Sequence, residues 1–436
     1  MNRKSISLKD ISITLGFACF CIAVSFETLI ETVIGSIGLY ALYFLSVVMT
    51  LYFISGHKGV HIQKKALNSL MPWIIFALIF VLFYNANLYR ASFFATIRWM
   101  YFFVYMILIS HINPKKYTHL IKVLGIVAGV YVLFVFFFMV FPSQYSVMYN
   151  LWGYWPTGTD SGASGYRAGL AAHYSENAMM ISMAVFAVVC LFMTESRKQR
   201  KIWFFAFFAV SVAALVLTTK RAHLLFGFVA ILFAYFVFKP RQRAKRFFII
   251  VIGAAALLAA FYLLSLYVPA VGDIVERFSN MGEDTESSTR FAMWDLAIKC
   301  FEDNPVFGIG WNGYKYEFNR VLFDPNVRAE RYAYLNAHNV YLQLLAETGV
   351  AGFSLFISGA VNIFSKTLKT LNRCVDPRLL SNRAPLVFSV IVQVFFYLYC
   401  LTGNCLYDIM FAFLAVAVGF AIGCRFSHSS PRLTSI

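Results

Sequence analysis

Long apolar runs, separated by short polar segments, follow one another along most of the chain. Runs of about 17 to 25 residues are long enough to cross a hydrocarbon layer about 30 Å thick as α-helices. Each run therefore predicts one membrane span, and we expect about twelve of them. The predicted spans lie near residues 11–30, 33–54, 70–85, 94–110, 120–141, 176–194, 202–217, 222–238, 247–268, 339–365, 386–402 and 405–424.

Composition supports this pattern. Hydrophobic residues make up 60% of the chain and charged residues only 13%, with a mean hydropathy of +0.69. Ordinary soluble domains are about half apolar and about one quarter charged. The predicted fold class is therefore an all-α integral membrane protein with about twelve transmembrane helices and a large loop on one side that contains amphipathic helices.

The distribution of charge predicts the orientation. The formal net charge is +17, and most of the 37 Lys and Arg residues lie in alternate connecting segments and at the two termini. Lys and Arg favour cytoplasmic loops, so both termini are predicted to be cytoplasmic. Basic runs such as Arg197–Lys201 and Lys239–Arg246 are then anchors that face anionic lipid, and no nucleic-acid partner is expected.

This topology divides the chain into three parts. Residues 1–268 contain the first nine spans, residues 269–338 form a long outer loop with a helical segment, and residues 339–436 contain spans ten to twelve and a cytoplasmic tail. A second outer loop, at 142–175, is rich in Gly and Ser between residues 156 and 169, and we expect it to be a mobile flap. Polar residues with a chemical role should lie on this outer side.

The long outer loop predicts an amphipathic helix. Good N-cap residues at 287–289 precede it, and Asn304-Pro305 ends it. Arg290 is then expected in the first turn, where unpaired backbone N–H groups and the positive end of the helix dipole favour an anion. The apolar face of this helix is expected to lie against the membrane or the helix bundle, and it contains Phe291, Trp294, Ile298 and Phe301.

Two more helix starts on the outer side have the same character. Lys220 and Arg221 follow two threonines that can cap the span near residue 222. His338 and Asn339 stand at the start of the span near residue 339. Three helix N-termini on one side of the membrane, two of them with an arginine, predict a binding site for phosphate or pyrophosphate. A neutral His338 at such a site can act as a general base on a sugar hydroxyl.

Each of these residues also has an ordinary structural role open to it. Basic side chains at helix ends commonly extend to the membrane interface, loop arginines are commonly solvated, and a histidine at a helix start is commonly a cap. Glu347, inside the tenth predicted span, is the more suggestive carboxylate because an intramembrane acid is unfavourable without a partner. His173 and His223 have no HxxxH or paired-carboxylate spacing, so no metal site is expected. Walker, GxSxG and Rossmann motifs are absent from the sequence, which argues against ATP-driven transport, serine hydrolysis and nicotinamide chemistry.

Three segments together resemble a known family. In chain order they read TKRAHLL, STRFAMWDLAIKCFEDNPVFGIGWNGY and AHNVYLQLLAETGVAG. They resemble the O-antigen ligase and polymerase superfamily of bacterial inner membranes. The last segment has His338, Asn339, nine further residues, Gly349, two residues and Gly352, which is similar to the ligase signature. Phe353-Ser354 then stand where the ligase pattern often has two threonines, which leaves the choice between ligase and polymerase open.

The resemblance implies a multi-pass, GT-C-type glycosyltransferase of the bacterial inner (cytoplasmic) membrane, with its large loop and its active site in the periplasm. It implies a glycan on undecaprenyl pyrophosphate as donor, lipid A core as acceptor, membrane lipid as surroundings, and no cofactor or metal. The implied site consists of the catalytic base His338, the pyrophosphate-binding residues Arg221, Arg290 and Lys220, and the supporting residues Asn339 and Glu347.

Other functions stay open at this stage. An O-antigen polymerase uses the same type of donor but extends a second polyprenyl-linked glycan. A protein O-oligosaccharyltransferase is a further option. We expect no long C-terminal soluble extension, and this argues against it. A polysaccharide flippase or other transporter belongs to a different class, and the lack of obvious two-half symmetry argues against it.

Overall fold

The computed structural model describes residues 7–55, 64–85, 90–141, 143–144, 169–171, 173–238, 243–267, 272, 285–324, 326, 334–373 and 383–427. Within these ranges the regular elements are all helical, apart from one isolated bridge between Asn85 and Trp311. The all-α fold predicted from the sequence is therefore confirmed for this part of the chain. Residues 156–168 of the predicted flap and the tail at 428–436 lie outside the described residues.

The helices follow the predicted apolar runs. Their bounds are α1 Leu8–Ser25, α2 Glu27–Val33, α3 Ser36–Ser55, α4 Lys64–Phe76, the π-helix η1 Ala77–Phe83, α5 Arg90–Ser110, the 3₁₀ turn η2 Pro114–Lys116, α6 Tyr117–Val140, α8 Tyr174–Thr194, α9 Lys198–Leu217, α10 Arg221–Phe238, α11 Arg243–Ser265, α13 Thr285–Asp303, α14 Gly313–Val321, α15 Val340–Arg373, α16 Ala384–Tyr399 and α17 Met410–Ser427.

Most of these helices have the length and composition of membrane spans. Among the described residues, eight helices are long and apolar enough to cross a membrane by these two criteria alone. Three shorter apolar helices lie within Asn68–Phe83, Ala384–Tyr399 and Met410–Arg425. The chain is therefore a helical membrane protein with several spans, whereas the number of about twelve spans and their orientation stay predictions.

The first apolar run is two helices where the sequence predicts one. Helix α1 ends at Ser25, and Phe26 has φ −117° and ψ 23°, which is not helical. Helix α2 then begins at Glu27. The single span expected at 11–30 is therefore wrong in this detail. The bend brings the polar residues Ser25 and Glu27 together at the end of α1.

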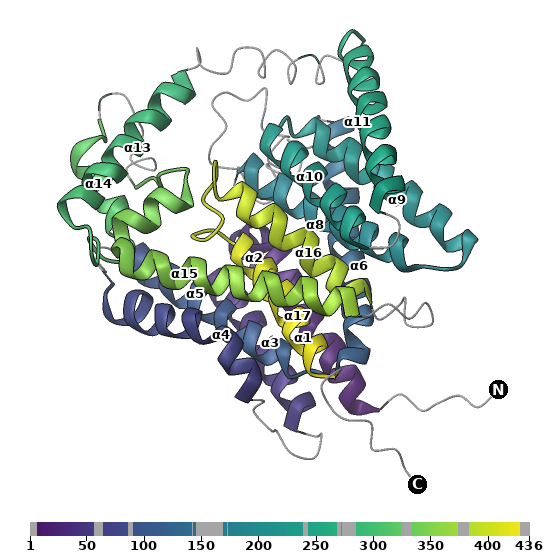
Figure 1. Ribbon diagram of the computed structural model, residues 1–436, viewed down its shortest axis with the longest axis horizontal. Coiled ribbons are helices and arrows are strands. Elements are labelled where there is room, and N and C mark those ends of the chain that lie inside the picture. The colour runs from purple at the N-terminus through teal and green to yellow at the C-terminus, as the bar shows by residue number, and fades with distance from the viewer. Residues whose placement is uncertain are drawn as a thin grey trace.

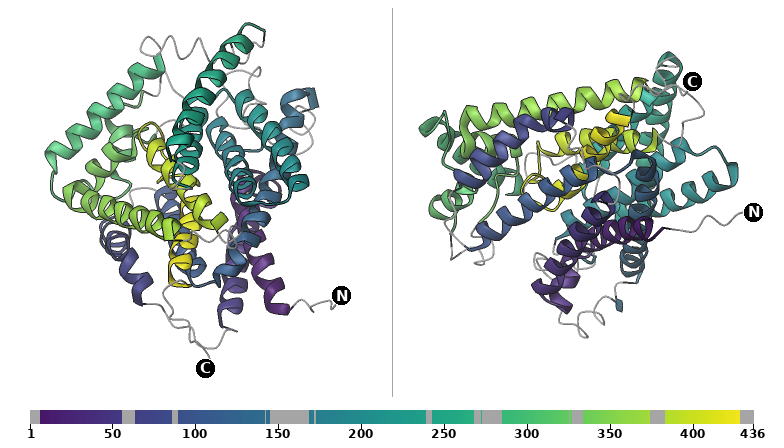
Figure 2. Two further views of the ribbon diagram at one scale, coloured as in Figure 1. Left: turned by 45° about the vertical axis from the view of Figure 1, so that its right-hand side comes forward. Right: turned by 90° about the horizontal axis from the view of Figure 1, so that it is seen from below.

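Helices α8, α16 and α17 form the centre of the bundle (Figure 1), and almost every side chain on them is buried. α17 packs against α5 and α16, and α16 packs against α8 and α10. α8 also contacts α6 and α9, while α1 contacts α3 and α6. The long helix α15 crosses the bundle and packs against α4 and α13 (Figures 1 and 2).

Small residues let the central helices approach one another closely. A Cβ atom at Gly419 of α17 would lie 2.8 Å from Ile109 Cγ2 of α5, and one at Gly423 would overlap the Tyr117 ring. The Tyr117 hydroxyl in turn donates to the Ile109 carbonyl at 2.8 Å. Close backbone approach through glycines spaced by four residues is a common way to pack helices in membranes, where dispersion contacts replace the hydrophobic effect.

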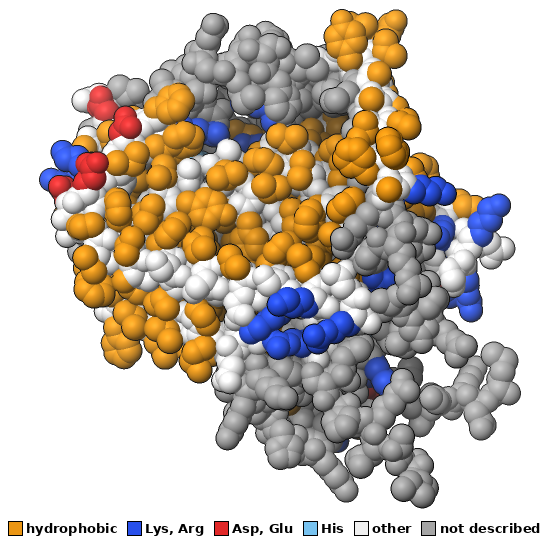
Figure 3. Space-filling view, viewed as in Figure 1, with side chains coloured by type: hydrophobic (Ala, Val, Ile, Leu, Met, Phe, Trp, Pro, Cys, Tyr) orange, Lys and Arg blue, Asp and Glu red, His pale blue; other side chains and the backbone are white. Residues whose placement is uncertain are grey.

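The surface of the bundle fits a lipid environment. Hydrophobic side chains cover a broad area across the centre of the face seen in Figure 3, while Lys, Arg, Asp and Glu lie mostly around it. Large apolar side chains such as Phe44 and Trp203 are 71% and 76% exposed. An apolar area of this extent would be unusual on a soluble monomer, and a bilayer would cover it.

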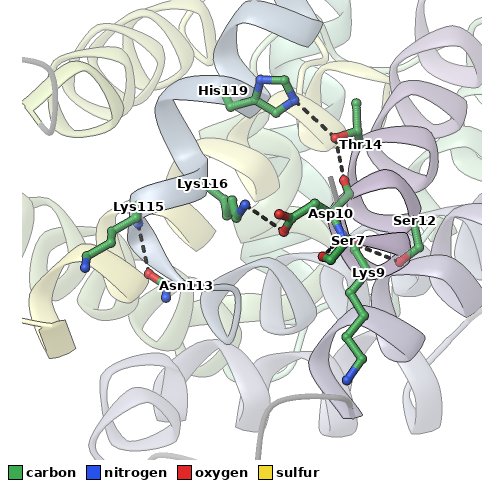
Figure 4. A network of polar contacts seen from close by, with 9 residues as sticks. All are labelled: Ser7, Lys9, Asp10, Ser12, Thr14, Asn113, Lys115, Lys116 and His119. Atoms are coloured by element: carbon green, nitrogen blue, oxygen red, sulfur yellow. Dashed lines mark hydrogen bonds and ion pairs between the residues drawn. The ribbon is translucent and has the colours of Figure 1, made fainter. Parts of the chain in front are cut away.

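A polar network ties the start of α1 to the start of α6 (Figure 4). Lys116 Nζ and Asp10 Oδ1 form an ion pair at 2.6 Å, and Thr14 Oγ1 lies 3.1 Å from His119 Nε2. The Ser7 hydroxyl accepts from the Asp10 N–H at 3.1 Å and caps α1. Apart from Thr14, which lies at the start of the first predicted span, these residues belong to segments that the sequence predicts to be cytoplasmic.

Helix α15 is sharply kinked at Gly349, where φ is 58° and ψ is −168°. At the kink, the turn at 305–310 exchanges backbone hydrogen bonds with the helix in both directions. The four bonds run from Ile309 N–H to Ala346 O, from Gly310 N–H to Glu347 O, from Val350 N–H to Pro305 O and from Ala351 N–H to Val306 O, at 2.9, 2.9, 2.9 and 3.1 Å. The turn thus satisfies the backbone groups that the kink removes from the α-helical pattern.

Helix α13 packs on its neighbouring helices through a face that lies beside the predicted apolar one. Phe291 and Ile298 of the predicted apolar face are 55% and 42% exposed. The buried face consists of Met293, Leu296, Ala297 and Cys300, which contact Tyr314 and Phe318 of α14 and Ala346 of α15. Trp294 of the predicted face packs against this cluster, whereas Phe291 and Ile298 lie on the outer surface, where contact with the membrane was also expected.

Candidate active site

His338 immediately precedes the capping residue of α15. Asn339 is that cap: its Oδ1 accepts from the N–H groups of Tyr341 and Leu342 at 3.1 and 3.2 Å. His338 itself has φ 54°, a left-handed conformation that is uncommon for residues other than glycine. Such local strain persists only where the surroundings impose it, and it is frequent at functional sites.

Asn404, in the connection between α16 and α17, holds His338 through two atoms. Its Oδ1 accepts from the His338 N–H at 3.0 Å, and its Nδ2 lies 3.4 Å from His338 Nδ1. The first bond fixes the orientation of the amide, because only the oxygen can accept from a backbone N–H. The NH₂ group therefore faces Nδ1. In the neutral ring this arrangement favours a lone pair on Nδ1 and the proton on Nε2.

The connection between α9 and α10 presents the cationic residues. Thr219 has φ 57°, a strained value for a β-branched residue, and it turns the chain so that Lys220 directly precedes α10. Lys220 Nζ lies 3.7 Å from the ring centroid of Tyr174, the first residue of α8. Arg221 is the first residue of α10, as the sequence predicts.

Tyr399, the last residue of α16, lies where these segments meet. Its hydroxyl is 3.2 Å from Ser175 Oγ on α8, and its ring centroid is 4.5 Å from that of His223 on α10. The next residue, Cys400, accepts through its carbonyl from the Val340 N–H at the start of α15, at 2.8 Å.

Arg290 lies on the side of α13 that faces the His338 segment. Trp294, one turn further along, donates from Nε1 to the Ala337 carbonyl at 3.0 Å. Residues four apart lie on the same face of a helix, so Arg290 projects from the same side. The expectation that Arg290 occupies the first turn is wrong, because α13 begins at Thr285 and Arg290 is its sixth residue.

Helix N-termini therefore contribute less to this site than the sequence predicts. The N–H groups of Val340, Tyr341 and Leu342 at the start of α15 already have protein acceptors. Arg290 lies beyond the turn of α13 in which the dipole acts strongly. Positive charge at the site comes mainly from side chains. At α10 the first residue, Arg221, and the residue before it, Lys220, are both cationic.

Glu347 is fully buried and organises the segment before His338. Its Oε1 accepts from Gln343 Nε2 at 3.0 Å, and its Oε2 accepts from the Tyr407 hydroxyl at 2.8 Å. Gln343 Nε2 also lies 3.0 Å from Asn336 Oδ1, and its Oε1 accepts from the Ala337 N–H at 3.0 Å. The buried carboxylate thus has the polar partners that its position requires, and it acts on His338 through Gln343.

The structure places Lys220 beside Tyr174, and Arg290 one turn before Trp294, which contacts the residue preceding His338. It adds residues that the sequence analysis did not single out: Tyr174, Ser175, Gln343, Tyr399 and Asn404. One signal for the last two was present in the sequence, since they are polar residues near the end of an otherwise apolar span. Their pairing with residues more than 60 positions away in the chain gave no local signal.

Among the residues that the structure describes, this site contains no cluster of metal ligands. No group of three or more His, Cys, Asp or Glu side chains converges there in a way that could hold a metal ion. The donors that do converge are cations, hydroxyls and amides. This set is suited to an anion and to sugar hydroxyls.

Comparison with known proteins finds one family match and one relative of similar sequence. The family model described as O-antigen ligase matches residues 206–357, which run from α9 into α15 and contain all four cationic and histidine candidates. A protein of Haemophilus influenzae described as uncharacterized is 26% identical over 212 residues, which are 46% of this chain and 53% of that protein. The chain thus spans about half the length of this relative. The region 206–357 is therefore similar in sequence to the O-antigen ligase family.

Proposed function

We propose that this protein is a membrane glycosyltransferase that moves a glycan from a polyprenyl pyrophosphate carrier to an acceptor hydroxyl. One observation carries the proposal: segments far apart in the chain lie together at the start of α15. Lys220 contacts Tyr174, the neighbour of Ser175, which contacts Tyr399, and α13 contacts the residue before His338 through Trp294, one turn from Arg290. Two cations beside an imidazole suit a diphosphate leaving group next to a nucleophilic hydroxyl. The family match supports this class of substrate.

The cations stabilise the leaving group. As the bond between the anomeric carbon and the phosphate oxygen breaks, negative charge grows on the pyrophosphate, and preorganised positive charge lowers the energy of that state. Arg290 and Arg221 can each offer two parallel N–H donors to phosphate oxygens, and Lys220 adds a point charge. The apolar polyprenyl tail would lie between the spans.

His338 takes the proton of the acceptor hydroxyl. In the neutral ring Nδ1 holds the lone pair, with the Asn404 amide 3.4 Å away. The acceptor hydroxyl replaces this long contact, its oxygen forms a bond to the anomeric carbon, and its proton passes to Nδ1. The resulting imidazolium carries its second proton on Nε2. Displacement from the face opposite the pyrophosphate inverts the anomeric centre.

The finer assignment is O-antigen ligation in the bacterial inner membrane. In this proposal the donor is a glycan on undecaprenyl pyrophosphate, the acceptor is lipid A core, and the site faces the periplasm because the basic connections face the cytoplasm. Phe353-Ser354, in place of two threonines, favours the polymerase as second candidate. Deleting the gene separates the two: loss of a ligase leaves core-only lipopolysaccharide, whereas loss of a polymerase leaves core with a single repeat.

A transfer reaction with purified protein tests the proposal as a whole. The donor is carrier-linked glycan extracted from membranes of the source bacterium, and the acceptor is lipid A core from a strain without O-antigen. In detergent, without a sealed compartment, we expect glycan-bearing lipid A core to form. If the protein instead moves glycan only across intact membranes and never joins it to an acceptor, it is a transporter and the proposal is wrong.

Arg290→Lys keeps the charge but removes the planar fork of donors. We expect kcat/KM for transfer to fall by about 10- to 100-fold, because a lysine offers no bidentate contact to phosphate oxygens. Arg320→Lys is the matched control, since the Arg320 side chain on α14 is 63% exposed and pairs with Glu317. Equal activity of Arg290→Lys and the parent protein would show that bidentate recognition is unnecessary.

Asn404→Asp tests which ring nitrogen acts as the base. A carboxylate opposite Nδ1 accepts a hydrogen bond instead of donating one, so it favours a proton on Nδ1. We expect transfer at neutral pH to fall by about 100-fold and to recover partly at higher pH. Asn113→Asp, in the network of Figure 4, should have no effect on transfer. Full activity of Asn404→Asp would identify Nε2 as the base.

A further inference from the structure

A separate cavity lies among the ends of α1, α2, α5 and α8 and the connection before α17. Its volume is about 240 Å³, and its wall includes Ser25, Glu27, Glu31, Arg98, Glu176 and Asp408. Pockets for drug-sized ligands are about 300 to 1,000 Å³, so this cavity suits a smaller group of about one sugar ring. It forms at the bend between α1 and α2, which the sequence did not predict.

The cavity adjoins the candidate active site along two segments. Glu176 directly follows Ser175, whose hydroxyl contacts Tyr399. Asp408 lies four residues after Asn404 in the same connection between α16 and α17. A group bound in this cavity would therefore lie close to segments that also form the candidate active site.

Two buried polar atoms at the cavity wall have no hydrogen-bond partner among the described residues. Ser25 is only 4% exposed, and its hydroxyl has no hydrogen-bond partner among the described residues. Glu27 bonds Arg98 through Oε1, while its buried Oε2 has no hydrogen-bond partner. Buried polar atoms without partners are unfavourable by themselves, so these two atoms indicate that a ligand supplies the missing hydrogen bonds.

The charges around the cavity select the kind of ligand. The ion pair with Glu27 offsets Arg98, and Glu31, Glu176 and Asp408 add further carboxyl groups. Such a wall repels phosphate and carboxylate groups, in contrast to the cationic site beside it. Burial raises the pKa of Asp408 to about 6 and also raises the pKa of Glu31. The Asp408 carboxyl can therefore exchange between donating and accepting hydrogen bonds near neutral pH.

Apolar side chains complete the wall. Val24, Leu170, Met180 and Ile409 line the cavity together with the acids. A pyranose ring presents hydroxyl groups at its edge and C–H groups on its faces, so it matches a cavity with both kinds of wall. A metal ion is a poorer match, because the carboxylates do not converge into a metal-binding group among the described residues.

We propose that this cavity binds one uncharged, hydroxyl-rich sugar ring of a glycan substrate, next to the cationic site that binds the pyrophosphate. The inference rests on the proposed glycosyl transfer and names a subsite for it. The ring belongs either to the acceptor glycan or to the donor glycan. Its hydroxyl groups donate to Glu27 and to the neighbouring carboxylates and pair with Ser25.

Ser25→Ala and Asp408→Asn test the subsite in the transfer reaction. We expect KM for one substrate to rise about fivefold for Ser25→Ala and about tenfold or more for Asp408→Asn, with little change in kcat. The substrate whose KM rises identifies the ring as donor or acceptor. Glu317→Gln, on α14 outside the cavity, is the matched control. Unchanged KM values for both substrates in both variants would overturn the subsite and leave the proposed function intact.

Stability separates a binding role from a structural one. Ser25→Ala removes a buried hydroxyl without a partner, so its melting temperature should equal or exceed that of the parent protein. A lower melting temperature together with unchanged KM values would assign Ser25 to the fold alone and contradict the inference.

Direct binding makes the subsite testable without turnover. The probes are core oligosaccharide released from lipopolysaccharide of the source bacterium by mild acid, and O-antigen repeat oligosaccharide, each measured by saturation-transfer NMR. We expect the parent protein to bind one of them and Asp408→Asn to bind it at least tenfold more weakly. If the parent protein catalyses no transfer but shows this binding, the proposed function fails and the subsite stands. If it binds neither oligosaccharide, the subsite is wrong.

Discussion

His338→Asn is expected to reduce glycan transfer at least about 100-fold while the protein accumulates normally. General acid–base catalysis by a positioned side chain typically contributes about 10²- to 10⁴-fold, and asparagine has no group that accepts a proton at neutral pH. Asparagine also tolerates the left-handed conformation that His338 adopts at φ 54°, so the backbone before α15 should be unchanged. In cells, long O-antigen ladders on lipopolysaccharide should disappear.

The control for this variant is a histidine at another place in the fold. His119 contacts Thr14 near the start of α6 (Figure 4), and its substitution by asparagine should leave the ladders intact. Protein amount in the membrane has to be compared for all variants. Normal ladders with His338→Asn would remove the imidazole from the mechanism and would leave the cations as the functional part of the site.

Helix positions were the most predictable level of this structure. Every apolar run coincides with a helix, because the bilayer fixes the length of a span and its interior requires backbone hydrogen bonds within the span. The break at Phe26 and the kink at Gly349 were not predicted. Both depend on contacts with other segments, and the apolar pattern continues through each of them.

The start and the face of α13 show the limits of local signals. Thr285, Ser287, Ser288 and Thr289 are all suitable first residues for a helix, so the sequence could not select Thr285. Apolar residues occur on more than one side of this helix, and the choice of buried face was decided by Tyr314 and Phe318 of α14. Tertiary packing therefore set the side chains that α13 buries, and the start at Thr285 places Arg290 beyond the first turn.

The candidate site was predictable as a set of segments and not as a geometry. Chain order and charge indicated Lys220, Arg290 and His338, but the position of Tyr399 near the end of a span did not show that it contacts Ser175, 224 positions away. The contact between Asn404 and His338 joins residues 66 positions apart. It determines which ring nitrogen holds the lone pair, and no pattern in the sequence contains that information.

The kink explains the glycines that follow His338 in the sequence. Gly349 has φ 58° and ψ −168°, a region of backbone conformation that is essentially restricted to glycine. Its missing side chain also lets the turn at 305–310 approach α15, since a Cβ atom there would overlap the carbonyl group of Val306. Gly308 faces the same constraint from the other side, with φ 72° and its Cα against the backbone of Glu347.

Gly349→Ala is therefore expected to destabilise the protein by at least about 3 kcal/mol, the combined effect of an unfavourable backbone conformation and a steric overlap in a buried contact. Loss of the four backbone bonds between the turn and α15 would also release Glu347, and with it the Gln343 contacts that hold the segment before His338. Folded protein in detergent extracts should fall sharply when measured by size-exclusion chromatography.

Gly253→Ala in α11 is the matched control for the same chemical change. A Cβ atom at Gly253 would meet nothing within 4 Å, and alanine is the better helix former, so this variant should be as stable as the parent protein or slightly more stable. A folded, active Gly349→Ala protein with an unchanged melting temperature would mean that the kink is not needed to hold the histidine segment. Transfer would then have to depend on Asn404 and the start of α15 alone, since these contacts do not pass through the kink.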